Sequence, residues 1–268
     1  SGTIDESIRH AITKFAHIHF PACDGAKERI IRLGEDPNHV HMVGCPRIDL
    51  VADLLSSNSF EINSNLFSSG VGSSLNLDKP FVLISQHPVT TEFGEGEKQI
   101  LNTLEAVREV NIPAIVLWPN ADAGSDDISQ GIRKWRESKL DGEMHFFKNL
   151  PVEDYIFLMN KTSCLIGNSS SGIREGAFIG TPVVNIGSRQ NARERGKNVI
   201  DINHTKNEII NALSFQISHG KYQSEAIYGD GNAGKKIADI LSKENVEIQK
   251  TITSVSYTHL TLPTIRSV

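Results

Sequence analysis

A run of small and hydroxyl residues, Gly167-Asn-Ser-Ser-Ser-Gly172, follows a short apolar stretch and leads into a predicted helix. Backbone N–H groups, the positive end of the helix and two or three hydroxyls would converge there on an anion, so the run predicts a phosphate-binding loop. Glu175 lies one turn inside that helix, where its carboxylate could accept hydrogen bonds from vicinal ribose hydroxyls. The alternative is a serine-rich capped turn with Glu175 as a surface acid. The run matches neither the dinucleotide-binding fingerprint nor the P-loop motif.

Polar side chains also follow three other predicted strands. His87 comes directly after one strand, where it could donate a proton to a ligand in a cleft, although a single loop histidine is more often structural. Asn120 and Asp122 follow the next strand, in a loop that is either a ligand rim or a helix entry. Arg189 and Arg193 follow a third strand, where they could clamp a diphosphate or simply be solvated.

Asp5 and Arg9 lie one helical turn apart on a predicted first helix, which opens with the capping-box residues Thr3 and Glu6. This spacing puts the carboxylate and the guanidinium on one helix face. Taken alone, the pair is best interpreted as an exposed ion pair that contributes about 0.3–0.5 kcal/mol.

Other chemistries find little support in the sequence. The pairs His17/His19 and His39/His41 have no accompanying cysteines or carboxylate cluster, so we expect no metal site. There is no Gly-x-Ser-x-Gly elbow and no cysteine with a convincing base partner, so neither a serine nor a cysteine hydrolase is predicted. An odd number of cysteines without Cys-x-x-Cys spacing indicates a reducing cytoplasm; they are Cys23, Cys45 and Cys164.

Apolar stretches alternate with segments of helical periodicity along most of the chain. In the first part we expect strands at 17–20 and 40–43 and helices at 3–16, 24–33 and 47–55. In the second part we expect strands at 81–84, 114–117, 144–147, 164–166, 183–186 and 199–202, and helices at 95–110, 126–137, 152–161, 172–179, 205–218 and 232–246. Wholly apolar strands separated by helices predict a doubly wound α/β domain with a parallel sheet. Ligands of such sheets bind beyond the carboxyl ends of the strands, where the polar side chains above would gather.

Residues 56–79 are rich in Ser, Asn and Gly without a sustained period, which predicts a linker or domain boundary. Residues 251–268 show neither helical period nor strand alternation and are expected to be a disordered or non-native tail. The composition, with 38% hydrophobic and 22% charged residues, is typical of a soluble globular protein. A net charge of −5 without a basic tract argues against nucleic acid or a membrane as the partner, but it allows a small anionic ligand.

Several of these stretches occur together, in this order, in one known family. They are Ser1-Gly-Thr-Ile-Asp-Glu-Ser-Ile-Arg-His10, Gln86-His-Pro-Val-Thr-Thr91, Pro119-Asn-Ala-Asp-Ala-Gly-Ser125, Gly167-Asn-Ser-Ser-Ser-Gly-Ile-Arg-Glu175, Gly187-Ser-Arg-Gln190 and Tyr228-Gly-Asp-Gly-Asn-Ala233. From residue 1 to about residue 243, the chain resembles the hydrolysing UDP-N-acetylglucosamine 2-epimerases of the sialic-acid pathway. The resemblance implies two Rossmann-like domains in a glycosyltransferase-B-like arrangement. This chain would contain the complete C-terminal domain at 80–250, a connecting helix and linker at 47–79, and only the last part of the N-terminal domain at 1–46.

The resemblance also implies a reaction without NAD or a metal ion, in which UDP-N-acetylglucosamine and water give N-acetylmannosamine and UDP. UDP is eliminated to leave a glycal, which water then attacks, so acid/base groups are needed on opposite faces of the sugar. By motif, the implied catalytic residues are Asp5, the charge-stabilising Arg9, and His87 near the departing diphosphate. The implied UDP-binding residues are Ser169, Ser170, Ser171, Gly172, Glu175 and Arg189, with Leu150 and Tyr155 around the uracil, and the loops described above add a candidate rim of Asn120, Asp122 and Arg193.

The sequence begins just downstream of the place where the family carries its other catalytic carboxylates. We therefore expect most of the first domain to be absent and this chain alone to turn over poorly or not at all. A complete protein would be a cytoplasmic homo-oligomer, as members of the family commonly are. Three alternatives stay open. The first is a sister enzyme acting on UDP-N,N′-diacetylbacillosamine in legionaminic-acid synthesis. The second is a retaining glycosyltransferase, which should not need Asp5 and Arg9, and the third is a non-catalytic UDP-sugar-binding module.

Overall fold

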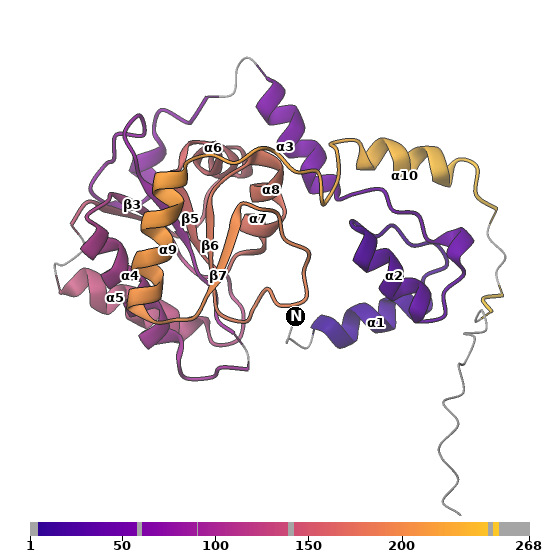
Figure 1. Cartoon of the computed structure of the whole chain (residues 1–268), viewed down its shortest axis with the longest axis horizontal. Helices are drawn as coiled ribbons and strands as arrows, with labels where there is room; N and C mark the ends of the chain where they lie inside the picture. The colour runs from indigo at the N-terminus through magenta and orange to yellow at the C-terminus, as the bar shows by residue number, and fades with distance from the viewer. Residues whose placement is uncertain (1–4, 58–60, 90, 139–141, 246–248, 252–268) are drawn as a thin grey trace, which may run out of the picture.

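The computed structural model describes residues 5–57, 61–89, 91–138, 142–245 and 249–251, and nearly all of the expected tail lies outside these ranges. Figure 1 shows two parts, a sheet flanked by helices and a smaller group of helices to which both ends of the chain contribute. Helix α3 (Pro46–Ser56) leads from the smaller part to the larger one. None of the helices in the described ranges is long and apolar enough to cross a membrane.

The larger part is built on a seven-stranded sheet in the order β1-β4-β3-β2-β5-β6-β7. Its strands are β1 (Val71–Gly72), β2 (Val82–Ser85), β3 (Ala114–Leu117), β4 (Met144–Phe147), β5 (Cys164–Gly167), β6 (Val183–Ile186) and β7 (Val199–Ile202). Strands β2 to β7 pair in parallel, whereas the short β1 pairs antiparallel with β4 at one edge. The predicted doubly wound α/β fold is confirmed. Strand β1 and the 3-10 turn Leu66–Ser69 lie within 56–79, where the composition predicted only a linker.

Alternating side chains of strands β2 to β6 face two separate apolar cores, which is why these strands are largely apolar. In β2, Val82 and Ile84 belong to one core and Leu83 to the other. The first core is covered by α4 (Gly96–Val110), α5 (Ser125–Glu137) and α9 (Lys206–His219). The second core is covered by α3, α6 (Val152–Lys161) and α8 (Glu175–Ile179). Burial on both faces fixes the sheet and therefore the positions of its carboxyl ends.

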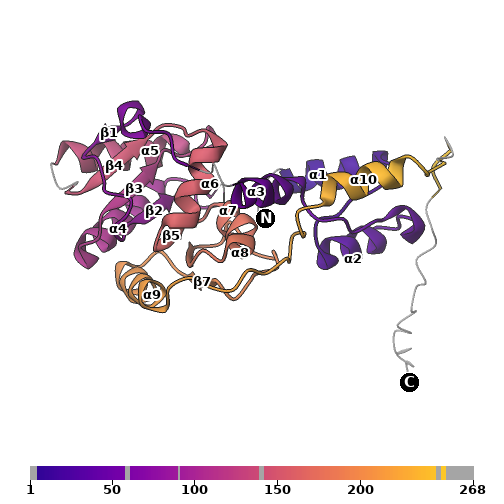
Figure 2. The same cartoon turned by 90° about the horizontal axis from the view of Figure 1, so that it is seen from above.

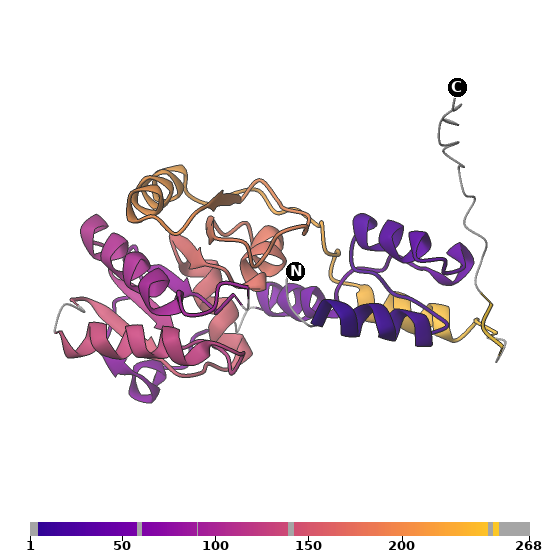
Figure 3. The ribbon, with the colours of Figure 1, turned by 90° about the horizontal axis from the view of Figure 1, so that it is seen from below.

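The smaller part groups α1 (Asp5–Phe15), α2 (Asp24–Arg32) and α10 (Ala233–Leu241), as Figures 2 and 3 show from opposite sides. Asp49 of α3 joins the two parts, because its carboxylate accepts hydrogen bonds from the backbone N–H groups of Ala233 at 2.9 Å and Gly234 at 2.7 Å. These two N–H groups lie in the first turn of α10, where they have no partner within the helix.

Four of the predicted elements differ clearly in the structure. The strands predicted at 17–20 and 40–43 are reduced to one parallel bridge between His19 and Val40, since Pro21 has no N–H with which to extend the ladder. The helix predicted at 172–179 is divided into α7 (Ser170–Ile173) and α8 by a break at Arg174. The helix predicted at 232–246 ends at Leu241.

Candidate functional site

The strand order reverses between β2 and β5, which lie side by side while the chain winds outward from them in both directions. Crevices at such reversals are the ligand sites of open α/β sheets. Gly167 ends β5 with φ of +131°, and a Cβ at this position would lie 2.2 Å from the carbonyl oxygen of Ser85 in β2. Only glycine allows this close approach. The two loops that start here are therefore held against each other from their first residue.

Asn168 fixes the loop after β2 to the loop after β5. Its side-chain Oδ1 accepts a hydrogen bond from the backbone N–H of His87 at 2.7 Å, and its Nδ2 donates to the carbonyl of His87 at 2.8 Å. The carbonyl of Asn168 in turn accepts from Gln190 Nε2 at 2.7 Å, which ties in the loop after β6. Asn168 is almost completely buried. Asn168 thus sets the relative positions of three loops at the carboxyl edge, through its side chain and its backbone carbonyl.

His87 is buried and held in one orientation at the end of β2. Its Nδ1 accepts a hydrogen bond from the backbone N–H of Asn120 at 3.3 Å, and its Nε2 lies 3.4 Å from Ser85 Oγ. Burial lowers the pKa of His87 to about 4, with a further decrease from Arg189 that Asp122 partly offsets. The imidazole is therefore neutral at pH 7. Because Nδ1 accepts, Nε2 carries the proton and is a hydrogen-bond donor.

The serine loop is organised by hydroxyl contacts. Ser169 Oγ lies 2.8 Å from Ser171 Oγ, and Ser171 Oγ lies 2.5 Å from the hydroxyl of Tyr155, which projects from α6. Burial raises the pKa of the Tyr155 phenol, so this group keeps its proton. Gly172 has a different role, because a Cβ there would lie 3.0 Å from Val183 and 3.1 Å from Leu165. It lets the loop pack against the sheet and does not face the cavity.

Glu175 places a carboxylate beside this loop, and half of that carboxylate has no partner. Its side chain is 4% exposed, with Oε1 3.3 Å from Arg174 Nη2 and 3.7 Å from Arg47 Nε. Oε2 is buried without a hydrogen-bond partner. Burial raises the pKa of Glu175, and the charges of Arg174 and Arg47 offset part of the rise. A buried carboxylate oxygen without a donor is costly, so this atom marks a place for a ligand that donates hydrogen bonds.

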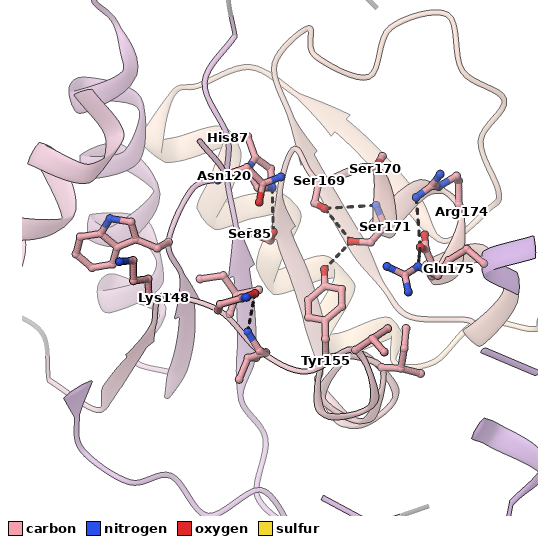
Figure 4. Close-up of a pocket in the computed structure, with 17 residues that line it drawn as sticks. Ser85, His87, Asn120, Lys148, Tyr155, Ser169, Ser170, Ser171, Arg174 and Glu175 are labelled. Atoms are coloured by element: carbon pink, nitrogen blue, oxygen red, sulfur yellow. Dashed lines mark hydrogen bonds and ion pairs between the residues drawn. The ribbon is translucent and has the colours of Figure 1, made fainter. Parts of the chain in front are cut away.

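These side chains line a cavity of about 300 Å³ at the carboxyl edge, shown in Figure 4. Eight of the predicted site residues contribute to its lining: His87, Asn120, Leu150, Tyr155, Ser169, Ser170, Ser171 and Glu175. Several other lining residues were not predicted from the sequence, including Arg47, Trp118, Lys148, Asn149 and Arg174. Lys148 directly follows β4, so the rule that ligands bind at carboxyl ends, extended to this strand, would have found it. Arg47 carried no signal, because only the packing of α3 brings it to Glu175.

Three other predicted residues, Asp122, Arg189 and Arg193, are not among those that line the cavity. Arg189 pairs with Asp122 at 3.2 Å, and both charges act on His87. Arg193 is half-buried, and its pKa is lowered by burial and by the charges of Arg174, Arg9 and Arg189. These arginines give the region between α1 and the cavity a positive potential, which suits an anion.

Two further sequence predictions are located less fully. Arg9 is an exposed residue of α1, and Asp5 begins that helix but its side chain is outside the described part of the chain. Within the described ranges, no group of three or more His, Cys, Asp and Glu side chains is placed to hold a metal ion.

The sequence has clear relatives. A family model described as UDP-N-acetylglucosamine 2-epimerase matches residues 1–242. The chain is 34% identical over 241 residues to UDP-N,N′-diacetylbacillosamine 2-epimerase (hydrolyzing) of Legionella pneumophila, which covers 90% of this chain and 61% of that protein. It is 29% identical over 258 residues to UDP-N-acetylglucosamine 2-epimerase of Neisseria meningitidis serogroup B, with 93% and 65% covered. The chain thus spans less than two thirds of the length of both relatives.

Solved structures share the fold. The chain superposes with a TM-score of 0.67 and 17% identity on UDP-GlcNAc 2-epimerase from Neisseria meningitidis bound to UDP-GlcNAc, covering 87% of this chain and 63% of that one. The TM-score is 0.65 at 14% identity for the Methanocaldococcus jannaschii UDP-GlcNAc 2-epimerase in complex with UDP-GlcNAc and UDP, with 85% and 62% covered. The likeness confirms the expected glycosyltransferase-B-like arrangement. Since the family model spans nearly all of the described residues, this chain belongs to the UDP-N-acetylglucosamine 2-epimerase family.

Proposed function

We propose that this chain supplies the nucleotide-binding half of a hydrolysing UDP-N-acetylglucosamine 2-epimerase. The observation that carries the proposal is the buried, unpartnered Oε2 of Glu175, in a cavity that also presents the hydroxyls of Ser169 and Ser171. Vicinal ribose hydroxyls are the donors that such an oxygen lacks, and serine hydroxyls with nearby arginines are suited to phosphate. Two solved structures of the same fold contain UDP-GlcNAc.

UDP would extend along the lining of the cavity. We place the ribose at Glu175 and the phosphates at Ser169, Ser170 and Ser171. The uracil would lie toward Leu150 and the ring of Tyr155. The volume of about 300 Å³ is at the lower end of the range for small-molecule sites, which fits a nucleoside with its sugar diphosphate continuing toward α1.

In the proposed reaction a base removes the proton from C2 of the sugar. The C2–H electron pair becomes the C1=C2 double bond, the C1–O bond breaks, and UDP leaves with the electrons of that bond. Neutral His87 can donate its Nε2–H to the departing diphosphate, and Arg189 and Arg193 supply positive charge as the leaving group gains negative charge. Water then adds its hydroxyl to C1 and a proton returns to C2 on the other face, giving N-acetylmannosamine. Asp5 and Arg9 are the acid/base group and the cation that we assign to α1.

One alternative sugar has specific support. The 34% identity to the Legionella pneumophila enzyme favours UDP-N,N′-diacetylbacillosamine as a second candidate substrate. We retain UDP-N-acetylglucosamine as the first proposal, because the family model and the Neisseria meningitidis relative carry that name. We also retain the expectation of a cytoplasmic homo-oligomer for the complete protein.

The test is a proton NMR time course of the purified chain with each UDP-sugar. We expect saturation transfer to the uracil and ribose protons, with little or no release of free sugar. Absence of saturation transfer from a chain shown to be folded would refute the nucleotide site. Steady release of N-acetylmannosamine and UDP at a normal enzymatic rate would confirm the reaction and refute our expectation that the chain alone turns over poorly.

A further inference from the structure

Lys250, in the segment after α10, makes several contacts with the end of α1. Its Nζ donates to the backbone carbonyls of Thr13 at 3.0 Å, Lys14 at 2.9 Å and Ala16 at 2.5 Å. These carbonyls lie at the C-terminal end of α1, where the last carbonyls of a helix have no partner within the helix and carry partial negative charge. The ammonium group of Lys250 therefore caps α1 from outside.

The same ammonium group is held by a buried carboxylate. Lys250 Nζ lies 2.6 Å from Glu35 Oε2, and the side chain of Glu35 is only 3% exposed. Glu35 also pairs with Lys14 Nζ at 3.0 Å and with His19 Nε2 at 3.0 Å. Although burial raises the pKa of Glu35, hydrogen bonds from Lys250, Lys14 and His19 hold it below its ordinary value, so the carboxylate is charged. Glu35 thus links α1, the end of α2 and the segment after α10.

Apolar packing does not explain how α1 is held. The large apolar residues Ile8, Ile12 and Phe15 of α1 are 52%, 59% and 82% exposed. Helix α2 has no buried residue. In the described ranges, the polar cluster around Glu35 is therefore a principal attachment of α1, and it acts at the end of the helix opposite Asp5.

We propose that Lys250 is a positioning residue, which fixes α1 and so holds Arg9 in place relative to the nucleotide cavity. The functional consequence rests on the proposed role of Arg9, whereas the clamp itself rests only on the contacts of Lys250. The residues that line the cavity come from the sheet part and from Arg47 of α3, and they include none of α1 and none of the segment after α10, so the clamp and nucleotide binding are separable.

Hydrogen exchange measured by mass spectrometry tests the clamp in the full chain. We compare Lys250→Met, which keeps the aliphatic length but removes the charge and donors, with Lys250→Arg, which keeps both. Lys243→Met is the matched control, because Lys243 is an exposed lysine just after α10 whose side chain makes no hydrogen bond or ion pair within the described residues. We expect the α1 amides of Lys250→Met to exchange about tenfold faster or more, which is the scale of a lost charged hydrogen bond. Lys250→Arg should restore most of the protection, and the control should match the unmodified chain.

Titration with UDP separates this inference from the proposed function. The affinity of Lys250→Met for UDP should equal that of the unmodified chain, because the cavity is unaffected. Unchanged exchange in α1, or an equal acceleration in α1 and in the β-strands, would overturn the positioning role. Failure of the unmodified chain to bind UDP would instead refute the nucleotide site and would leave the exchange result standing for the clamp.

Discussion

Replacing Glu175 by glutamine tests the proposed ribose contact with almost no change in shape. The substitution keeps the side-chain length but removes the charge from an oxygen that is buried without a partner. A hydrogen bond to a charged group contributes about 1.5–3 kcal/mol. If the ribose hydroxyls donate to Oε2, Glu175→Gln should weaken UDP binding by roughly tenfold to 150-fold, since each 1.4 kcal/mol corresponds to a factor of ten.

Isothermal titration calorimetry with two ligands distinguishes the contact between Glu175 and the ribose from any general effect of the substitution. UDP and 2′,3′-dideoxy-UDP are each titrated into the unmodified chain and into Glu175→Gln. The unmodified chain should prefer UDP strongly, and the variant should lose most of that preference while binding the dideoxy nucleotide with similar affinity. An unchanged preference for UDP in Glu175→Gln would refute the reasoning, because the ribose would then be recognised elsewhere.

Three further predictions concern neighbouring residues. The pKa of His87 is about 4 in the folded chain and about 6.5 in the unfolded chain, so only the unfolded chain gains a proton as pH falls between these values. The free energy of unfolding should therefore drop by about 3 kcal/mol over that range, and urea titrations of His87→Asn should show a smaller drop. Asn168→Ala leaves the backbone N–H and carbonyl of His87 without partners and should lower the free energy of unfolding by roughly 2–4 kcal/mol in urea titrations; a change below about 1 kcal/mol would contradict the cross-linking role. Arg193→Gln should reduce the affinity for UDP by about tenfold and leave the affinity for UMP almost unchanged. Lys197→Gln in the same loop should alter neither affinity. Equal losses of affinity for both nucleotides in Arg193→Gln would exclude a contact with the second phosphate.

Strand positions in the sheet were predictable because the strands from β2 onward are short, largely apolar segments, and β2 to β6 are buried between the two apolar cores. Strands β3, β4, β6 and β7 lie at the predicted residues. The same signal failed at 17–20, since an apolar segment becomes a strand only when a neighbour can continue the hydrogen-bond ladder, and Pro21 interrupts it. Local pattern could not reveal β1 either, because its two residues are ordered by pairing with β4.

The loop motifs were predictable for a related reason. Ser169, Glu175 and His87 each follow a buried strand, and parallel strands bring their carboxyl ends to one edge. Arg47 reaches the same cavity without a motif of its own. Its contribution depends on the reach of its side chain and on the packing of α3, which are not encoded in a local pattern.

The sequence by itself determined the family, the parallel sheet and about half of the side chains around the cavity, because these follow from motifs and from apolar periodicity over a few residues. The tertiary structure alone decided how the groups act. It left Oε2 of Glu175 buried without a donor, and it made His87 a neutral donor by burying it. It also joined Asn168 to His87 across 81 residues and Lys250 to Ala16 across 234. Burial and long-range hydrogen bonds are properties of the assembled chain, so no local pattern predicts them.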